Sequence, residues 1–598
     1  MHYFTNLKNS AKRSLAKYFK RINSLRNRDL YVFLLSILII IAIKFIQFPS
    51  LTHNAEMFAE NGTNFFLHAY KDNLLTNLLT TDAGYLPLTQ RIIAVTLVKG
   101  FHAVALYPFL SQLIAVFIIA VMSSLINFNI FKNFHQSALI RFILGISIGL
   151  ISDYELNAFI NFIYYGAIFL FLGIFINKKK LNKSIFFLFT LTTVIILLSK
   201  GQFIVFIPIY LILALLYFRK KDYRSLTYYL FAIAAGLTQL IVMYINIPQA
   251  ASTNRLLHLP YYVIKTVYYF FLTYKHVFFG YIAKEGTTFI SMGILLLLLV
   301  VGIKTLLSKK DWQTLSIFLA GNFIALCSLF LTVVALSNSA HIQTKAATAP
   351  SASKTVLTTP QKITQAVIDD SRREKNVLEV KHFANLRSMF ISNLLIFLTG
   401  IIVILYIFPR KSQKILVLLI LLYSSGAFGQ IRVEEAYANK NQSYSQWNHY
   451  YHLLNNNQFC IPVNHYPFLL QQNCDYLLYK NQDLPLLNSP VQFIELSKIT
   501  PTAKNWEIQA VALINKPLQF SATSFFELYA YDKKDEIIGR AKQLVPGNYE
   551  YIYYLFDKPV LSADKLIWRT REGKEIKIIP NILIFGTDKK VSHRRFEY

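Results

Sequence analysis

The chain has 598 residues, of which 54% are hydrophobic and only 15% are charged, and its mean hydropathy is +0.39. This composition excludes an ordinary soluble protein, because a soluble chain of this size needs a far more polar surface. The formal net charge of +30 could indicate a nucleic-acid partner. However, residues 431–598 hold 20 of the 61 Lys and Arg and 17 of the 31 Asp and Glu, which leaves 41 basic and 14 acidic residues before them. The excess therefore belongs to the apolar part of the chain, and we predict no nucleic-acid partner.

Apolar runs of about 15–22 residues recur along the first 430 positions, and each is long enough to cross a hydrocarbon layer of about 30 Å. They predict a mainly α, polytopic membrane protein with about eleven transmembrane helices. The predicted spans are Leu30–Phe48, Leu106–Ile126, Ala138–Ile151, Ala158–Ile176, Ser184–Leu198, Phe203–Phe218, Leu226–Ile247, Phe289–Ile303, Leu315–Leu336, Phe390–Phe408 and Ile415–Phe428.

Basic residues gather in alternate connections between these spans. Eight Lys and Arg precede Asp29, and further clusters follow in "NKKKLNK", "RKKDYR", "KTLLSKKDW" and "PRKSQK". Because cytoplasmic loops carry an excess of Lys and Arg, we predict that residues 1–29 are cytoplasmic and that the first span is an uncleaved anchor. The protein is then expected in a bacterial inner (plasma) membrane, with its basic loops facing anionic membrane lipids.

Several outer segments have the character of a membrane interface. Apolar residues at near-helical spacing between Asn54 and Thr80 predict amphipathic helices in the outer loop 49–105, and Ile92–His102 predicts another. The outer loop Pro248–Thr288 is aromatic and basic and is also expected to be interfacial. The stretch Ser337–Pro360 is rich in Ser, Ala and Thr, which predicts a loop.

Residues 431–598 predict an extracytoplasmic C-terminal domain. Positions 431–500 are polar and irregular, whereas from about Trp506 apolar residues alternate with polar ones between turn signals, which predicts a β-sandwich-like domain. Cys460 and Cys474 both fall in this domain, where disulfides persist, and the sequence leaves open whether they are bonded.

Acidic residues outside the membrane are the first candidates for chemistry. Asp153 and Glu155 are two residues apart in "SDYELNAFINF", in a short gap between two apolar runs. This spacing allows two carboxylates to converge on a divalent cation such as Mg²⁺ or Mn²⁺, which would neutralise a phosphate leaving group. The alternative is a pair of solvated loop acids.

These features resemble the GT-C superfamily of polytopic membrane glycosyltransferases, which carry an acid after the first span and a second acidic motif in the next outer loop. The stretches "AENGTNFFLHAY", "AGYLPLTQRIIAV", "ELNAFINFIYYGAIFL" and "SKGQFIVFIPIYLIL" are also similar to a bacterial multi-span group of that type. The resemblance covers roughly residues 30–220, and the chain departs from the group's acid-acid-Gly pattern at Asn61. It implies a GT-C-like transmembrane domain at 30–430, with interfacial helices in the 49–105 outer loop.

The resemblance also implies a function, which is transfer of a sugar from a polyprenyl-phosphate donor to an envelope glycan or lipid acceptor on the outer face of the membrane. Glu60 is the first candidate for the base that deprotonates the acceptor hydroxyl, and Asp82 is the second. Asp153 and Glu155 would then bind the metal or orient the acceptor. Cationic side chains would hold the phosphate. The site candidates for this role are Arg91, Arg255 and Arg387, with Lys200, His258 and Lys265 as further outer-face candidates.

Other classes of protein fit parts of the sequence. A transporter or flippase for a lipid-linked saccharide would need charged groups along a mid-membrane path, and the spans are almost free of acids. A non-enzymatic assembly protein would act through its C-terminal domain. An O-antigen ligase or polymerase would use the late outer loop, in which His341, Arg372, Arg373 and His382 are candidates.

Overall fold

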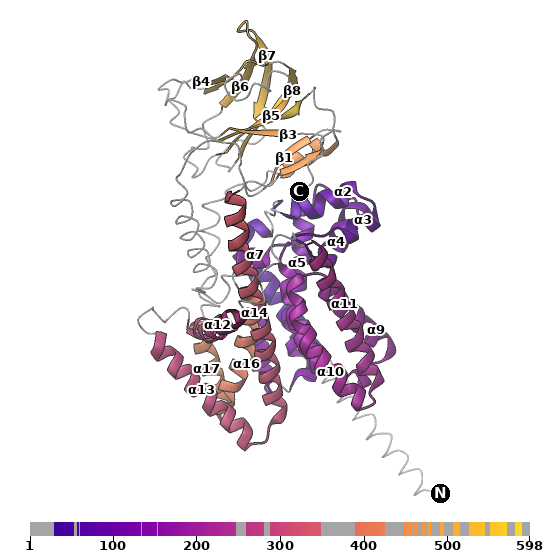
Figure 1. The fold of residues 1–598 in the computed structure, drawn as a ribbon, viewed down its shortest axis with the longest axis vertical. Helices are drawn as coiled ribbons and strands as arrows, with labels where there is room; N and C mark the ends of the chain where they lie inside the picture. Colours follow the sequence, from indigo (N-terminus) through magenta and orange to yellow (C-terminus); the bar gives the residue numbers. More distant parts are fainter. Residues whose placement is uncertain are drawn as a thin grey trace, which may run out of the picture. The chain divides into compact units, whose positions relative to one another are not determined.

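A computed structural model describes residues 29–52, 55, 57–58, 60–132, 134–151, 153–246, 259–279, 288–348, 389–424, 447–455, 459–463, 469–472, 475–479, 491–495, 506–514, 526–543, 551–561, 563–570 and 581–588. The chain forms two compact units (Figure 1). The first unit comprises Met1–Gln47, Leu78–Ile92 and Ile114–Val433, and the second comprises Phe48–Asn77, Ile93–Leu113 and Glu434–Tyr598.

Six helices are long and apolar enough to cross a membrane, so the protein is a mainly helical, multi-pass membrane protein. Shorter helices overlap the other predicted spans. The long ones are Asp29–Gln47, α5 (Tyr107–Ser124) with η4 (Leu125–Asn127), η8 (Gly201–Phe206) with α10 (Ile207–Arg219), α11 (Tyr223–Asn246), α14 (Trp312–Thr348) and α16 (Phe390–Ile407). The shorter ones are α6 (Ala138–Gly149), η6 (Phe162–Tyr165) with α8 (Gly166–Ile174), α9 (Lys183–Leu197), α13 (Thr288–Ser308) and α17 (Lys411–Ser424).

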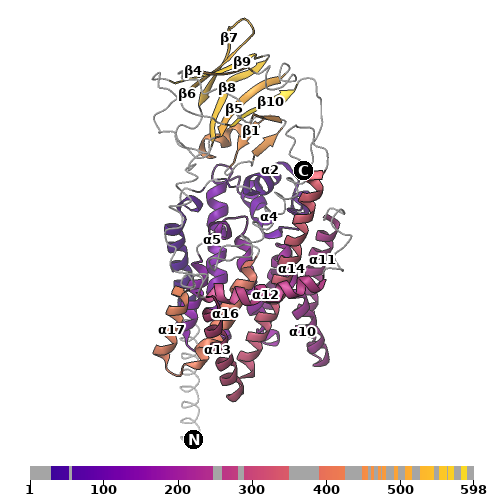
Figure 2. The same ribbon diagram turned by 60° about the vertical axis from the view of Figure 1, so that its left-hand side comes forward.

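Two helices of the first unit clarify the predicted outer segments. Helix α12 (Leu259–Phe279) runs across α14 and α16 rather than along them (Figure 2), which is the orientation expected of a helix lying along an interface. Helix α14 continues to Thr348, so the loop predicted to start at Ser337 begins later than the composition indicated. Alanine in this stretch favours a helix, and the Ser and Thr residues there do not stop it.

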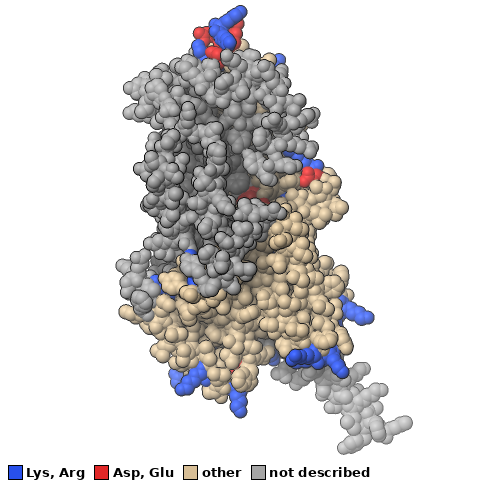
Figure 3. Space-filling view, in the orientation of Figure 1, with Lys and Arg blue, Asp and Glu red and all other residues tan. Residues whose placement is uncertain are grey.

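Basic connections meet at one end of the helical unit. Lys179 Nζ in the α8–α9 connection lies 3.8 Å from Asp222 Oδ2 in the α10–α11 connection. Tyr406, near the end of α16, donates a hydrogen bond of 2.7 Å to Asp311 in the α13–α14 connection, and Lys309 Nζ lies 5.0 Å from the Tyr406 ring centroid. Figure 3 shows Lys and Arg side chains along this end of the unit and an uncharged flank beside them. This separation is the one that the positive-inside pattern requires.

The second unit contains an antiparallel sheet of eight strands in the order β3-β10-β5-β8-β7-β6-β9-β4, and a separate two-stranded sheet β1-β2. Divided between β8 and β7, this order is that of the two four-stranded halves of a jelly roll. The strands are β1 (Phe459–Pro462), β2 (Leu469–Gln472), β3 (Asp475–Tyr479), β4 (Val491–Glu495), β5 (Trp506–Ile514), β6 (Phe526–Tyr531), β7 (Ile537–Gln543), β8 (Tyr551–Leu561), β9 (Lys565–Thr570) and β10 (Asn581–Asp588).

The predicted antiparallel β domain is therefore present, with two corrections. The β7–β8 pair joins the halves, so the strands form one continuous half-barrel sheet in place of two separate sheets of a sandwich. Irregular register at Phe585/Gly586 and at Ala530/Tyr531 increases the local twist and helps the sheet to curl. Strands also begin well before Trp506, since β1–β4 lie in the stretch that was predicted to be irregular. Among these four strands only β1 contains a Pro, and it lies at the end of the strand, where Pro is tolerated.

The outer loop after the first helix packs against the residues that lead into the sheets. The loop forms η2 (Asn61–Phe66), α2 (Leu67–Lys71), α3 (Leu74–Leu79), α4 (Leu88–Val95) and η3 (Thr96–Gly100), so the predicted helices are confirmed. The Trp447 ring of α19 (Trp447–Tyr450) packs edge-on against Phe66 at 5.2 Å, and its Nε1 donates to Val104 O at 3.1 Å. Tyr70 OH donates to Leu454 O in η12 (Tyr451–Asn455) at 3.2 Å. Most of the outer loop and the tail therefore belong to one compact unit.

We expect Trp447→Ala to lower the free energy of unfolding of the second unit by about 3–5 kcal/mol, because Trp447 is only 3% exposed and its removal leaves a cavity. Thermal unfolding in detergent, combined with proteolysis of the C-terminal domain, measures this loss. Tyr451→Ala is the matched control, since Tyr451 is 36% exposed, and it should change unfolding by less than about 1 kcal/mol. Equal stability of the two variants would contradict this account of the packing.

Candidate functional site

A buried lysine organises the end of the first unit that lies opposite its basic connections. Lys200 is the N-cap residue of η8, in an extended conformation, and is only 7% exposed. Its ammonium donates to Tyr85 OH at 2.8 Å and to Asn161 Oδ1 at 3.1 Å. It also lies 5.0 Å and 4.8 Å from the ring centroids of Tyr85 and Tyr164. These oxygen and π contacts compensate for removing the charge from water.

Three segments that are far apart in the sequence therefore meet at Lys200, namely "AGYLPLTQR", "ELNAFINFIYY" and "SKGQFIVF". Sequence analysis named Lys200 only as a further outer-face cation, because nothing in its neighbourhood distinguished it from the other basic residues. Its position next to Gly201, between an apolar helix and another apolar run, is the signal that could have identified it.

A tight turn presents Tyr85 to Lys200. Asp82 and Tyr85 exchange two backbone hydrogen bonds of 2.8 and 3.0 Å, and Ala83 and Gly84 both have positive φ, of 47° and 82°. This is the type I′ geometry, for which glycine is favoured at the second central position. The next residue is fixed by Gln239 of α11, whose amide donates to Leu86 O at 3.1 Å and accepts from Leu86 N at 3.2 Å.

Glycine at position 201 lets the three elements approach. A Cβ added there would lie 2.8 Å from Met243 Sδ and 3.4 Å from Tyr85 Cβ. A side chain would therefore push η8 away from α11 and from the Tyr85 turn. A second connection holds the same elements together, because Thr89 N donates to Ser199 Oγ at 2.9 Å and the two hydroxyls lie 2.6 Å apart.

The second half of the site is an irregular stretch between α6 and α8. Asp153 caps α7 (Tyr154–Asn157), where its Oδ1 accepts from Leu156 N at 2.8 Å. Backbone carbonyls that the broken helix leaves without partners are satisfied by side chains. Asn157 Nδ2 donates to Ile151 O at 3.0 Å and to Asp153 O at 2.6 Å, and Gln90 Nε2 donates to Ile160 O at 3.2 Å. Non-helical backbone is tolerated at such depth only where protein groups or a polar cavity satisfy it.

Lys44 brings a second positive charge to this stretch. Its side chain is fully buried, and its ammonium donates to Ile151 O at 2.7 Å. Burial raises the pKa of the partly buried Asp153 carboxyl to about 7, and the neighbouring charge of Glu155 also raises it. The Leu156 N–H and the positive charge of Lys44 oppose this shift. The Asp153 carboxylate also interacts electrostatically with the phenol of Tyr165.

Several buried polar atoms in this stretch find no hydrogen-bond partner among the described residues. They include Asn161 Nδ2 and Tyr165 OH, whose residues are 2% and 0% exposed. Lys200 can only donate, so it fixes the Asn161 amide with Oδ1 toward the ammonium and Nδ2 away from it. Buried donors are rarely left without partners in a native protein, which makes a ligand with acceptor oxygens the natural complement of this site.

The structure places the predicted site residues as follows. Arg91 is fully buried on α4, directly after Gln90, which contacts the irregular stretch. Asp82 is partly buried in the Tyr85 turn, and Asp153 and Glu155 lie at the start of α7. Glu60 precedes η2 in the second unit, so it is not part of the site built from the first unit. Arg255, Arg387, Glu56, His258 and Cys474 lie outside the described residues.

The predicted divalent cation does not fit the described side chains well. Asp153 is already used as a helix cap and faces the charge of Lys44. Within the described part of the chain, no group of three or more His, Cys, Asp or Glu residues could hold a metal ion. Two carboxylates next to an ammonium make a poor ligand set for a hard cation, so we derive no chemical step through a metal.

Comparisons with known proteins do not add to this description. The chain matches no protein-family model, no curated protein and no solved structure. The case for a function therefore depends on the site itself.

The raised pKa of Asp153 predicts a specific pH dependence of stability. Because the folded state binds this proton more tightly than the unfolded state does, the stabilisation is complete below about pH 4 and is lost as the pH rises from about 4 to about 7. Asp153→Asn should remove this slope while keeping the helix cap, since Asn is also a good N-cap residue.

Thermal unfolding of both proteins in detergent across this pH range measures the difference. Glu155→Gln is the control for loss of a neighbouring carboxylate and should largely keep the slope. An unchanged slope in Asp153→Asn would show that the Asp153 carboxyl is not perturbed in the folded protein.

Proposed function

We propose that the protein is a membrane glycosyltransferase, which moves a sugar from a polyprenyl-phosphate donor to an envelope glycan or lipid acceptor on the outer face of the bacterial inner membrane. The observation that carries the proposal is the convergence of three segments on the buried Lys200 ammonium, beside buried donors that find no partner among the described residues. We extend the six long apolar helices to an eleven-span topology with a cytoplasmic N-terminus and an extracytoplasmic C-terminal domain.

The chemistry of the site favours a phosphate ester as the ligand. Lys200 supplies a full positive charge, and Asn161 Nδ2 and Tyr165 OH supply neutral donors in a setting shielded from water. Charge-assisted hydrogen bonds in such a setting are about twice as strong as neutral ones. Arg91 is buried on the neighbouring helix α4 and adds a second cation to this end of the unit. A leaving phosphate would therefore be stabilised as its charge develops.

The position of the site suits a lipid substrate. It lies where α9 ends and η8 begins, and where the helical structure between α6 and α8 is interrupted. The basic connections mark the opposite end of the same helices, because η8 and α10 run from Lys200 to Arg219. Under the positive-inside assignment the site faces the outer surface. A lipid phosphate held at the membrane surface would reach it without leaving the bilayer.

Asp153 is the best candidate for the general base. A pKa near 7 lets the carboxylate accept a proton at neutral pH and still leaves an appreciable fraction ionised. In the proposed step it removes the proton from the acceptor hydroxyl, and the oxygen attacks the anomeric carbon of the donor sugar. The bond between that carbon and the phosphate oxygen breaks, and the phosphate leaves with the electron pair toward Lys200. Asp153 thus takes the role that the sequence assigned first to Glu60 and then to Asp82.

We expect Lys200→Met to reduce transfer of a labelled sugar from polyprenyl phosphate to lipid acceptors by roughly 10- to 150-fold, because hydrogen bonds to a charged group contribute about 1.5–3 kcal/mol. Transfer is measured in membranes that contain equal amounts of each protein. Lys220→Met, which removes an exposed lysine at the basic end, is the matched control and should retain full transfer. Full transfer by the Lys200 variant would reject the site.

Asp153→Asn should separate binding from chemistry. If Asp153 is the base, the variant keeps its affinity for the donor lipid and loses about 100-fold or more in turnover, which is the usual range for a general base. Binding of labelled donor and single-turnover transfer measure the two quantities separately. Equal turnover of the variant and the natural protein would return the role of base to Glu60 or Asp82.

A further inference from the structure

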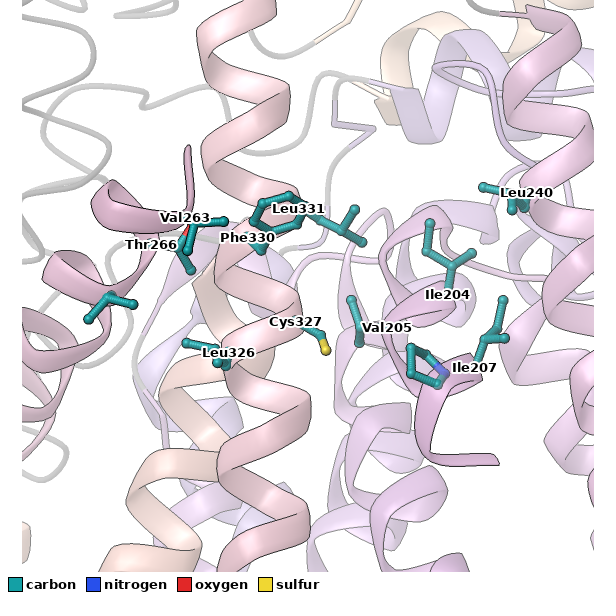
Figure 4. Close-up of a pocket in the computed structure, with 12 residues that line it drawn as sticks. Ile204, Val205, Ile207, Leu240, Val263, Thr266, Leu326, Cys327, Phe330 and Leu331 are labelled. Atoms are coloured by element: carbon teal, nitrogen blue, oxygen red, sulfur yellow. The ribbon is translucent and has the colours of Figure 1, made fainter. Parts of the chain in front are cut away.

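A cavity lies among the helices of the first unit, and η8, whose N-cap residue is Lys200, forms part of its wall. It has a volume of about 470 Å³ and is open on one side. Figure 4 shows Cys327 and Leu331 of α14 directed toward Val205 and Ile204 of η8, with Val263 of α12 on the other side of α14. Helices α10 and α11 complete the wall.

The lining leaves almost nothing for a polar ligand to bind. Its side chains are aliphatic or aromatic apart from Thr266 and Cys327, and none of them is charged. Thr266 uses its hydroxyl within its own helix, where it donates to Tyr262 O at 2.6 Å. A sugar or a peptide placed here would lose its hydrogen bonds to water without replacing them. A hydrocarbon chain makes no hydrogen bonds to water, so it loses none when it enters the cavity.

We propose that this pocket holds a hydrocarbon segment of a polyprenyl phosphate whose phosphate lies at Lys200. The inference rests on the proposed function only for the identity of the lipid. It assigns a subsite to side chains of α12, α14 and the later residues of η8, which the catalytic argument does not use.

Element η8 connects the two subsites directly. Lys200 caps its first turn, and Ile204 and Val205 line the pocket four and five residues later. A 3₁₀ turn rises about 2 Å per residue, so the backbone at the cap and at the pocket wall are about 8–10 Å apart. One lipid can therefore place its phosphate at one end of η8 and the first part of its chain at the other.

The surroundings indicate that the chain enters from the bilayer. The pocket is walled by α10, α11 and α14, each part of a long apolar segment that can cross a membrane, and its open side admits a ligand. Helix α12 contributes Val263, Thr266 and Val267, and its transverse course is that of a helix along the interface (Figure 2). A pocket beneath such a helix lies at the depth where the headgroup of a lipid ends and its chain begins.

Cys327 provides a built-in reporter of occupancy. In a background with Cys460→Ser and Cys474→Ser it is the one remaining cysteine of the three in the chain. We expect a long-chain polyprenyl phosphate, at about ten times its Kd, to slow alkylation of Cys327 by N-ethylmaleimide about tenfold, since only the unoccupied fraction reacts. Lys200→Met should raise the concentration needed for half-protection by roughly tenfold or more, because it removes a hydrogen bond to a charged group.

Three ligands distinguish the possible occupants. The long-chain polyprenyl phosphate should protect Cys327, the corresponding polyprenol without phosphate should protect it at clearly higher concentration, and phosphatidylglycerol should not protect it. Equal protection by phosphatidylglycerol would mean that the pocket takes any bilayer chain, and equal rates with and without polyprenyl phosphate would mean that it takes none. Either result overturns the inference.

A pair of substitutions on α14 checks the location. Leu331→Trp fills the pocket and should lower the amount of polyprenyl phosphate that remains bound after purification at least about fivefold, as measured by mass spectrometry. Leu319→Trp adds the same side chain at an exposed position of the same helix, outside the pocket, and should leave the bound lipid unchanged. Equal retention by the two variants would contradict the assignment.

These measurements do not depend on turnover, so the two proposals can fail separately. Protection of Cys327 without sugar transfer would leave the chain-binding pocket standing and reject the glycosyltransferase. Sugar transfer without protection would do the reverse.

Discussion

A buried ammonium needs oxygen atoms or aromatic faces around it, and the arrangement of the first unit follows from this requirement at Lys200. The Tyr85 turn comes from one part of the chain, and the Asn161 amide and the Tyr164 ring come from another, to supply it. The Tyr85 turn is fixed in turn by Gln239, which hydrogen-bonds to the backbone of Leu86. The absence of a side chain at Gly201 allows the segments to approach closely enough for these contacts. The same constraints that stabilise the charge therefore preorganise a cationic site.

The interrupted stretch from Leu150 to Tyr165 shows how the protein tolerates irregular backbone among apolar helices. Four side chains satisfy its carbonyl groups. Three come from outside the stretch, which are Lys44 at Ile151, Gln47 at Leu150 and Gln90 at Ile160, and the fourth is Asn157 of the stretch itself, at Ile151. The interruption would be costly in a packed apolar core. The hydrogen bonds from these side chains offset the cost of the interruption. Asp153 and Asn161 then lie in a region of low dielectric constant, where hydrogen bonds and charge interactions are stronger than in water.

The sequence predicted local properties well and distant contacts poorly. Hydropathy located the six helices that are long and apolar enough to cross a membrane, and alternation located the strands from Trp506 onward, because both patterns depend on neighbouring residues. Lys200 and Tyr85 are 115 positions apart, and Lys44 and Ile151 are 107 apart, so no local pattern connects them. The early strands β1–β4 were missed because each has only four or five residues. Polar residues or Pro among them obscure the alternation of apolar and polar positions that indicates a strand. Glu60 lies in the second compact unit, which spacing from a span could not show, and its role as the base stays a prediction.

Lys178, another buried lysine of the first unit, makes contacts that differ from those of Lys200. Lys178 is also enclosed by two tyrosines, with its ammonium 4.7 and 4.8 Å from the rings of Tyr228 and Tyr229, and burial lowers its pKa to about 7. It donates to the carbonyls of Gly173 and Ile174 as well as to Tyr229 OH, so it serves as the C-terminal cap of α8. Lys200 precedes a helical element and donates to side-chain oxygens, which can rotate to share the charge with an incoming anion. The two lysines have similar aromatic surroundings but different oxygen partners, and under the proposed function this difference separates a structural lysine from one that binds a phosphate.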